Sequence, residues 1–259
     1  MKDLLNIALS GVSGQMNSLI IELVLDSPNI NIVSSYARKN SNNIGKSIDK
    51  SLVSSNLDNL GIKGGVIIDF TNPKLTKDLI NTALKFETPL VIGTTGLVTK
   101  DEKLLNEASK KIPIVYCSNT SIGITLLEKI VEDVSGILDE EWDIEILETH
   151  HGKKIDAPSG TALSLGKSAA RGRKVNLEKV YVSRRNDKRK KGQIGFSVMR
   201  GGDVAGEHTV NFFGKSERIE IIHRTTNRMI FAKGAIKAAH FANSNISPGL
   251  YTMKDVLNL

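Results

Sequence analysis

The chain has 259 residues, which is enough for one large domain or two of ordinary size, and either can bury a substantial core. With 40% hydrophobic residues, 24% charged residues and no apolar run near the roughly 18 residues of a membrane span, the composition excludes a transmembrane protein and fits a soluble α/β protein. The net charge of +7 is concentrated in residues 171–191, which contain ten basic and two acidic residues, so the rest of the chain is nearly neutral.

The amino terminus and the cysteine content favour a cytoplasmic protein. Asp3, Asn6 and Ser10 interrupt the apolar start of the chain, so we expect no secretory signal peptide. Cys117 is the only cysteine, which excludes an internal disulfide and a cysteine metal cluster and agrees with a reducing compartment.

The first half of the chain alternates short apolar runs with amphipathic segments. Residues 4–9 predict a strand, and apolar residues between Met16 and Val24 recur at helical spacing, which predicts a helix from Gln15. Further strands are predicted at residues 30–35, 65–70, 89–92 and 114–117, and further helices at residues 75–86 and 100–108. Strands that are apolar on both faces and alternate with helices predict a parallel sheet covered on both sides.

The pattern changes near residue 120. A predicted helix at residues 122–138 leads to a period-two alternation from Trp142 to Glu148, which predicts a half-buried strand. Three strands without intervening helices and a closing helix are predicted at residues 194–199, 208–213, 218–223 and 227–242. We therefore expect a second, α+β part with a mixed or antiparallel sheet that is exposed on one face.

A glycine loop, Gly11-Val12-Ser13-Gly14-Gln15-Met16-Asn17, lies between the first predicted strand and helix. Backbone N–H groups and the positive end of the helix dipole can bind a pyrophosphate there. The loop reads G-x-x-G and has Asn17 where a third glycine would allow close helix packing, and ordinary tight turns share this spacing. The strand, turn and helix context favours a dinucleotide site.

The residues after the second strand bear on which nucleotide binds. About 20 residues beyond such a loop, an NAD site usually places Asp or Glu on the ribose hydroxyls. This chain has Tyr36-Ala37-Arg38-Lys39-Asn40 instead. Arg38 and Lys39 would pair with the 2′-phosphate of NADP, and the alternative is that both are solvent-facing loop cations. We predict a preference for NADPH over NADH that is not exclusive.

Small polar residues follow three further strands, in the segments Asp69-Phe70-Thr71-Asn72, Gly93-Thr94-Thr95-Gly96 and Cys117-Ser118-Asn119-Thr120. Carboxyl ends of parallel strands form the ligand crevice of such sheets, so these segments could approach the nicotinamide. The threonines and the last segment could equally be turn formers. Cys117 is the only candidate thiol nucleophile, but its position at a strand end favours a packing role.

His150, His151 and Lys154 form a candidate proton-transfer site. If the strand from Trp142 continues through residue 151, His150 shares a face with Ile144 and Ile146 while His151 points the other way. An imidazole can give or take a proton at neutral pH, and a lysine can balance a carboxylate or deliver a proton. Metal ligation is the alternative, but no nearby cysteine or H-x-x-x-H motif supplies further ligands.

A predicted helix start follows in Asp156-Ala157-Pro158-Ser159-Gly160-Thr161. Ser159 is a plausible N-cap, and the free N–H groups of Gly160 and Thr161 could bind a carboxylate. A dicarboxylic substrate could then lie between this helix start and the lysine and histidines, as a reductase would need.

Together these residues resemble the dihydrodipicolinate reductases, also called 4-hydroxy-tetrahydrodipicolinate reductases, of the diaminopimelate route to lysine. The resemblance covers nearly the whole chain. It rests on Gly11-x-x-Gly14-x-Met16, residues 68–71, 93–96, 195–203 and 206–209, and above all on Glu148-Thr149-His150-His151-Gly152-Lys153-Lys154-Ile155-Asp156-Ala157-Pro158-Ser159-Gly160-Thr161-Ala162.

The resemblance implies an NADPH- or NADH-dependent oxidoreductase that reduces 4-hydroxy-tetrahydrodipicolinate to tetrahydrodipicolinate. It implies a Rossmann-like dinucleotide-binding domain of residues 1–121 with a returning carboxyl-terminal helix in residues 231–259. A smaller α+β domain with a mixed, largely antiparallel sheet, residues 122–230, would bind the substrate and build a homotetramer. No nucleic acid, membrane or metal is implied.

The resemblance also assigns roles to residues. His150 would be the proton donor and acceptor, and Lys154 a second proton donor. Substrate carboxylate contacts would come from His151, Gly160 and Thr161. Cofactor contacts would come from Gly11, Val12, Ser13, Gly14, Gln15, Met16, Arg38, Lys39, Gly93, Thr94, Thr95, Cys117, Ser118, Asn119 and Thr120. An acidic ribose-binding residue common in the family is replaced here by Arg38 or Ala37, depending on alignment.

The basic segment, residues 171–191, has three possible roles. It could be a solvated, mobile excursion, or it could steer an anionic substrate or cofactor toward the protein. A nucleic-acid-binding role would need aromatic stacking residues beside the charge, and Tyr181 is the only aromatic residue in the segment. We therefore expect an enzyme and no nucleic-acid partner.

Overall fold

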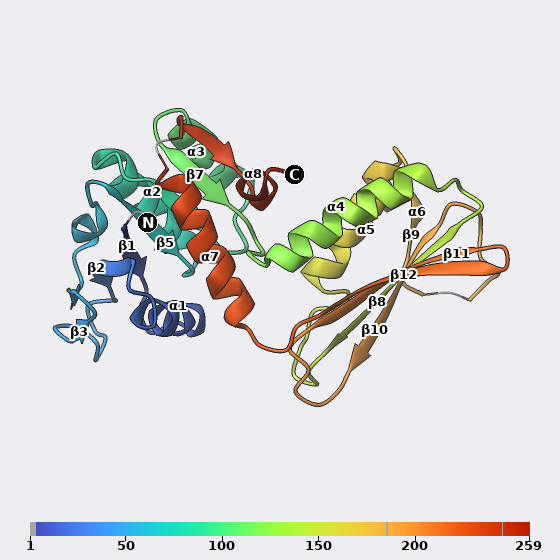
Figure 1. Ribbon diagram of the computed structural model, residues 1–259, viewed down its shortest axis with the longest axis horizontal. Helices are drawn as coiled ribbons and strands as arrows, with labels where there is room; N and C mark the ends of the chain where they lie inside the picture. Colours follow the sequence, from blue (N-terminus) through green and yellow to red (C-terminus); the bar gives the residue numbers. More distant parts are fainter. Residues whose placement is uncertain (1–3, 185, 245) are drawn as a thin grey trace. The chain divides into compact units, whose positions relative to one another are not determined.

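The computed structural model describes residues 4–184, 186–244 and 246–259, and their contacts divide the chain into two compact units (Figure 1). The first unit comprises the residues up to Ile122 together with Met229–Asn258, and the second comprises Gly123–Arg228. No helix in the described ranges combines the length and the apolar character that crossing a membrane requires.

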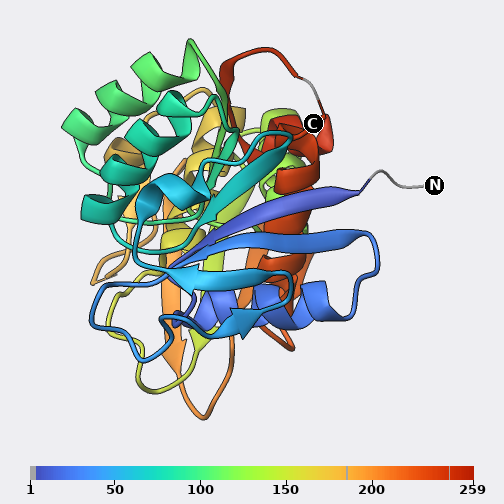
Figure 2. The same ribbon diagram turned by 90° about the vertical axis from the view of Figure 1, so that its left-hand side faces the viewer.

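The first unit is built on an eight-stranded sheet in the order β13-β7-β6-β5-β1-β2-β4-β3 (Figure 2). All neighbouring strands are parallel except β3 and β4, which confirms the predicted parallel sheet. The strands are β1 (Leu5–Ser10), β2 (Ile30–Tyr36), β3 (Ser47–Ile48), β4 (Ser51–Ser54), β5 (Gly65–Asp69), β6 (Leu90–Ile92), β7 (Pro113–Tyr116) and β13 (Gly249–Tyr251).

Helices cover both faces of this sheet. The helical segments are α1 (Gln15–Leu25), the short 3₁₀ turn η1 (Leu57–Leu60), α2 (Pro73–Lys85), α3 (Thr99–Ser109), α7 (Met229–Ala242) and α8 (Met253–Leu257). Strand β1 shows the arrangement, because Leu5 and Ile7 pack with α1, α7 and α8, whereas Ala8 packs with α2 and α3 on the other face. Each of these three strand residues is fully buried, as strands of a doubly covered sheet require.

The second unit is a five-stranded mixed sheet in the order β12-β11-β8-β10-β9. Strand β8 is antiparallel to β11 and parallel to β10, which confirms the mixed sheet expected from the sequence. The strands are β8 (Asp143–His150), β9 (Tyr181–Val182), β10 (Ile194–Arg200), β11 (Glu207–Gly214) and β12 (Glu217–Arg224), and the helices are α4 (Ile122–Ile137), α5 (Gly160–Gly172) and α6 (Leu177–Val180).

The helices of the second unit pack on one face of its sheet. The core combines Leu127 and Val131 of α4, Leu165 of α5, and sheet residues such as Ile146 and Phe212. The alternation along β8 places every second side chain, from Ile144 to His150, on this buried face. Near the end of β8, this buried face meets the start of α5, where the N–H of Ser159 donates to Glu148.

Candidate active site

The glycine loop joins β1 to α1 and has the geometry of a phosphate cradle. Gly11 adopts a φ of +70°, and its N–H donates to the carbonyl of Tyr36 at 2.9 Å. A Cβ at residue 11 would lie 2.6 Å from Cγ2 of Thr71, so only glycine fits. Gly14 is the N-cap of α1, whose first-turn N–H groups have no partner within the helix.

Asn17 occupies the place where a third glycine would allow close helix packing. Its side chain is fully buried, and Nδ2 donates to the carbonyls of Ser10 and Gly11, the latter at 2.7 Å. The asparagine therefore holds the loop to α1 with hydrogen bonds where a glycine would rely on close packing.

A buried carboxylate, Asp69 at the end of β5, ties three strand ends together. Its Oδ1 accepts from Ser10 Oγ at 2.8 Å, from Thr71 Oγ1 at 2.6 Å and from the N–H of Thr71 at 3.1 Å. Its Oδ2 accepts from Thr76 Oγ1 at 2.5 Å and from Thr94 Oγ1 at 3.0 Å. This carboxylate therefore organises the sheet edge that carries the glycine loop.

A cavity of about 740 Å³ opens beside the loop. Arg38 and Lys39 are exposed at its rim, just beyond β2, whereas Ala37 is buried. The structure therefore brings both cations to the glycine loop from more than 20 residues away in sequence. The lining residues are Gly11, Ser13, Gly14, Tyr36, Ala37, Arg38, Lys39, Asn40, Ser41, Phe70, Thr71, Asn72 and Leu75.

The other predicted residues of the loop lie beside this cavity without lining it. Val12 is buried in the core of the first unit. Gln15 and Met16 open α1, where Gln15 is exposed and Met16 is partly buried.

The segment after β6 divides its two threonines between different environments. Thr94 is buried and serves as a turn former, because its Oγ1 donates to Asp69 and accepts from the N–H of Thr71 at 2.9 Å. Thr95 is exposed and remains available to a ligand. Gly93 lies directly against the ring of Phe70, since a Cβ there would be 2.0 Å from Cε1.

The segment after β7 is packed against α7. The hydroxyl of Thr120 donates to the carbonyl of Phe231 at 2.8 Å, and a Cβ at Gly234 would lie 1.7 Å from the carbonyl oxygen of Thr120. Asn119 accepts the N–H of Ser121 at 2.9 Å, and Ser118 is exposed. The side chain of Thr120 is therefore engaged with α7, a packing contact that neither the cofactor role nor the turn-forming role expected for this segment describes.

Cys117 is not suited to nucleophilic chemistry. It follows β7, and its N–H donates to the carbonyl of Ile92 at 3.0 Å. Burial raises the pKa of its thiol to about 12, so the thiolate is scarce at neutral pH. This supports the packing role that its position at a strand end favoured.

In the second unit, β8 ends at His150. Ile144, Ile146 and His150 share its buried face, as the period-two pattern predicted. His151 lies beyond the strand, where its N–H donates to the carbonyl of Val204, distant in sequence, at 2.8 Å. The two imidazoles therefore differ in environment because the strand ends between them.

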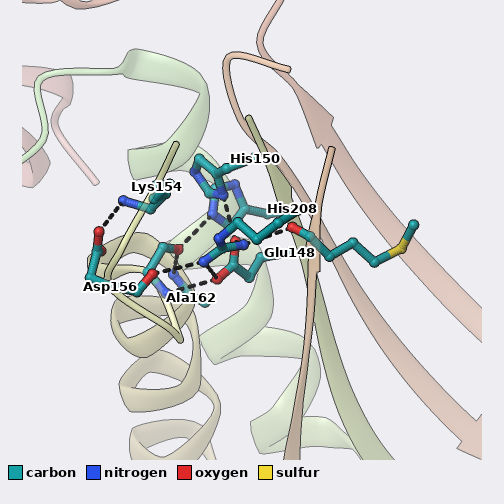
Figure 3. A network of polar contacts seen from close by, with 9 residues as sticks. Glu148, His150, Lys154, Asp156, Ala162 and His208 are labelled. Carbon is teal, nitrogen blue, oxygen red and sulfur yellow. Dashed lines mark hydrogen bonds and ion pairs between the residues drawn. The ribbon is translucent and has the colours of Figure 1, made fainter. Parts of the chain in front are cut away.

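His150 belongs to a buried polar network on three strands (Figure 3). Its Nδ1 lies 2.5 Å from Oε2 of Glu148, two residues earlier on the same face. Arg200 of β10 donates from Nη1 and Nη2 to the two oxygens of Glu148, each at 2.9 Å, and the N–H of Ser159 donates to Oε1 at 2.9 Å. Burial raises the pKa of Glu148, but these donors together hold it below its ordinary value.

His208 of β11 completes the network. Its ring lies edge-on to His150 with centroids 5.2 Å apart, and its Nε2 is 3.2 Å from Oγ of Ser159. Burial lowers the pKa of His208 to about 4, so it is neutral at physiological pH. Burial also lowers the pKa of His150, against the opposing effect of Glu148.

Lys154 lies in the loop that follows β8 and leads to the start of α5. Lys154 Nζ donates to Oδ1 of Asp156 at 2.7 Å, and this bond lowers the pKa of Asp156. Ser159 is the N-cap of α5, because its Oγ accepts from the N–H of Ala162 at 3.1 Å. Gly160 is exposed and has open space around it, so the first turn can receive a carboxylate.

The basic segment, residues 171–191, is partly docked on acidic residues. Arg189 pairs with Asp143 at 2.6 Å and with Glu145, and Lys191 pairs with Glu141. Arg171 pairs in the same way with Glu132 of α4, at 2.9 Å. The expectation of a solvated excursion is therefore wrong for Arg189, whose side chain is only 16% exposed, whereas Arg171 and Lys191 stay about half exposed in their ion pairs.

The remainder of the basic segment includes Arg184, which is exposed, and Arg185, which lies outside the described residues. Across the described part of the chain, no group of three histidine, cysteine or carboxylate side chains is arranged to hold a metal ion.

Four residues of this site had no expected role from the sequence: Glu148, Arg200, His208 and Gly206. Glu148 carried a usable signal, since the spacing Glu148-x-His150 on a predicted strand puts both side chains on one face. Arg200 and His208 reach the site only through strand pairing, because Arg200 is registered with His150 and His208 with Glu148.

The first unit combines a parallel sheet, a glycine loop and a nucleotide-sized cavity. The second unit combines a buried histidine–glutamate pair with a nearby lysine. Together these features define a nucleotide-dependent oxidoreductase. Family models described as the amino-terminal and carboxyl-terminal parts of dihydrodipicolinate reductase match residues 5–120 and 123–257. The chain belongs to the dihydrodipicolinate reductase family.

Relatives and solved structures agree with this assignment. The 4-hydroxy-tetrahydrodipicolinate reductase of Sulfurimonas denitrificans is 42% identical over 260 residues, covering 99% of this chain and 100% of that protein. The enzyme of the same name from Zymomonas mobilis is 47% identical over 197 residues, 75% of this chain and 77% of that protein. The dipicolinate-bound dihydrodipicolinate reductase of Paenisporosarcina sp. TG-14 has the same fold, with a TM-score of 0.78 at 21% identity over 96% of this chain and 97% of that one.

Proposed function

We propose that this chain reduces 4-hydroxy-tetrahydrodipicolinate to tetrahydrodipicolinate with a pyridine nucleotide, a step of the diaminopimelate pathway to lysine. The observation that carries this proposal is the cluster of His150, Lys154 and the capped start of α5, which unites proton donors with a carboxylate site. The family's named activity and the dipicolinate bound to the Paenisporosarcina relative support a small cyclic dicarboxylate as the substrate.

In this proposal the two parts of the chain have different tasks. Residues 1–121 and 231–259 form the nucleotide-binding domain, and residues 122–230 form the substrate domain. The cavity-lining loop of Gly11, Ser13 and Gly14 holds the pyrophosphate at the positive end of the α1 dipole. The N–H groups of Gly11 and Gly14 donate to the carbonyls of Tyr36 and Gly11, so these two glycines shape the cradle, as the positive φ of Gly11 and its close approach to Thr71 indicate.

The proposed chemistry assigns protons to named atoms of the second unit. NADPH, when bound, supplies the hydride. Nε2 of His150 gives and takes a proton, because its Nδ1 is engaged by Glu148. Lys154 donates a second proton, which loss of the 4-hydroxyl as water requires. The N–H groups at Gly160 and Thr161, with His151, hold a substrate carboxylate.

A coupled assay tests the function directly. Pyruvate and aspartate semialdehyde, condensed by a dihydrodipicolinate synthase, supply the substrate, and loss of NADPH absorbance follows the reduction. We expect oxidation that depends on both precursors and on the synthase. Oxidation that occurs without them, or no oxidation by folded protein, contradicts the proposal.

We further propose that NADPH is preferred over NADH. Arg38 and Lys39 are exposed cations at the cavity rim, and residues 36–41 contain no carboxylate to bind ribose hydroxyls. Arg38→Ala should raise the Kd for NADPH about 5- to 30-fold, the equivalent of about 1–2 kcal/mol for a charge-assisted bond, and leave NADH within twofold. Lys63→Ala, at an exposed lysine away from the cavity, is the matched control. Equal effects of Arg38→Ala on both nucleotides contradict the preference.

We propose a cytoplasmic homotetramer built on the second sheet. Leu147, Met199, Phe213 and Ile222 lie on the face opposite α4 and α5, where Met199 is 54% and Ile222 42% exposed. Such an apolar face favours a second copy of the chain, and the number four comes from the family resemblance. Light scattering after gel filtration should give four chains, and Ile222→Glu should reduce this number. A monomeric wild type contradicts the proposal.

A further inference from the structure

Glu148 is a buried carboxylate whose contacts fix the direction of every hydrogen bond around it. Both of its oxygens accept from Arg200, and Oε1 also accepts from the N–H of Ser159. A guanidinium and a backbone N–H can only donate, so the carboxylate acts as an acceptor toward both. The remaining contact is the 2.5 Å approach of Oε2 to Nδ1 of His150.

We propose that Glu148 is a positioning residue for the reduction: its carboxylate, anchored by Arg200 and Ser159, keeps a proton on Nδ1 of His150 and thereby reserves Nε2 for proton exchange with the substrate. This assignment depends on the proposed function for the identity of the reaction, although the state of the imidazole does not. Glu148 itself touches neither substrate nor nucleotide in this account.

The tautomer follows from the donors present. Because Oε2 is an acceptor, Nδ1 of neutral His150 must carry the hydrogen, and the lone pair lies on Nε2. When His150 is protonated, the new proton lies on Nε2, where it can be donated. Arg200 prevents Glu148 from taking this proton instead, because its two donated bonds favour the carboxylate form.

Gly206 keeps space beside the reserved nitrogen. It adopts a φ of +155°, and a Cβ there would lie 3.1 Å from Nε2 of His150 and 3.4 Å from Cδ2. A side chain at residue 206 would therefore crowd the Nε2 edge of the ring. The backbone thus leaves free the nitrogen that Glu148 reserves.

Four charged or titratable groups act on His150: Glu148, Lys154, Arg200 and His208. Glu148 raises the pKa of His150, whereas burial, Lys154 and Arg200 lower it. His208 is held neutral by its own burial. Removing the charge of Glu148 therefore lowers the pKa of His150 further, and the protonated donor is lost at a lower pH.

The first test uses Glu148→Gln, which removes the charge with little change of shape. The alkaline limb of the kcat/KM profile should move about one to two pH units lower, as expected for loss of an adjacent opposite charge. Because Glu148 does not touch the substrate, kcat should fall about 100-fold or more while KM stays within threefold. The matched control is Glu145→Gln, because Glu145 lies on the opposite face of the same strand and also pairs with an arginine. This variant should leave the pH profile, kcat and KM unchanged.

The second test reads the tautomer by nuclear magnetic resonance of ¹⁵N-labelled histidine, with the His150 signals assigned from His150→Gln. In the wild type, at a pH above the pKa of His150, Nδ1 should be the nitrogen that carries the proton. In Glu148→Leu/Arg200→Met, which removes the whole buried ion pair and is expected to fold, Nδ1–H should no longer predominate. Nε2–H in the wild type, or an unchanged tautomer in the double variant, overturns the proposal.

The two readouts separate this proposal from the function on which it rests. The tautomer is measured on folded protein without turnover. If Nδ1–H predominates and depends on Glu148 but the wild type does not reduce the generated substrate, the positioning role stands and the proposed reaction fails. If the wild type reduces the substrate but Glu148→Gln keeps the wild-type pH profile, the positioning role fails.

Discussion

Asp69→Asn is expected to destabilise the first unit, because this carboxylate joins the ends of β1, β5 and β6. With the amide oxygen at the Oδ1 position, the donations from Ser10 and Thr71 survive. The amide nitrogen then faces the hydroxyls of Thr76 and Thr94, which donate to Oδ2 at 2.5 Å and 3.0 Å. Thr76 can turn to the carbonyl of Asn72, 3.0 Å away, so its loss is partly compensated.

The expected cost follows from the two lost donations. Hydrogen bonds to charged groups contribute about 1.5–3 kcal/mol each, and allowing for the compensated one we expect about 2–3 kcal/mol in total. For a chain of this size, that corresponds to a fall in Tm of about 4–12 °C. Thr94 loses its acceptor in this variant, and its Oγ1 holds the N–H of Thr71 in the cavity wall, so we also expect the Kd for NADPH to rise about fivefold.

The assay is a thermal melt followed by circular dichroism, together with calorimetric titration of NADPH. Asp58→Asn makes the same substitution at an exposed carboxylate that pairs with Lys85 at 2.5 Å, and should change stability by about 0.5 kcal/mol or less. If Asp69→Asn melts within about 2 °C of the Asp58→Asn control, Asp69 does not organise the sheet edge as argued.

Three further predictions concern individual side chains. Asn17→Gly should lower the free energy of unfolding, measured by chemical denaturation, by about 2 kcal/mol, because the loop loses two buried hydrogen bonds and α1 gains a glycine. An unchanged denaturation midpoint would show that close packing replaces these hydrogen bonds. Since burial lowers the pKa of His208 from 6.5 to about 4, the unfolded chain binds the proton first, and about 3 kcal/mol of stability present above pH 6.5 is lost as the pH falls to 4. His208→Asn should remove this component, and an equally steep acid loss in that variant would refute it. Gly206→Ala should lower kcat at least tenfold by crowding Nε2 of His150. Gly201 has open space around it, so Gly201→Ala should keep kcat near the wild-type value. Equal kcat values for the two variants would contradict the role of Gly206.

Much of the fold could be predicted because local periodicity carries it. The double-sided burial of β1, with Leu5 and Ile7 on one face and Ala8 on the other, follows from an uninterrupted apolar run. Strands β3 and β13 have two and three residues and no such run, so nothing local distinguishes them from loop. Pairing with neighbours distant in sequence makes them strands.

The features of the site that depend on neighbouring residues in sequence could be predicted, whereas those that depend on strand pairing could not. The face of His150 follows from the alternation along β8, and the cap at Ser159 follows from residue type. Arg200 lies 52 residues from Glu148 and reaches it through the β8–β10 register, which no short pattern encodes. For the same reason, the docking of Arg189 on Asp143 and Glu145 could not be read from the charge of its segment.

In the proposed function, His150 and Lys154 perform the proton chemistry of a nucleotide-dependent reduction. The most direct measurement compares kcat of the wild type and of Lys154→Ala with the synthase-generated substrate, alongside the Kd of each for NADPH. We predict that kcat falls about 100-fold or more while the Kd stays within twofold, because Lys154 lies in the second unit and the glycine loop in the first. A Lys154→Ala variant that keeps kcat within threefold of the wild type would contradict this account.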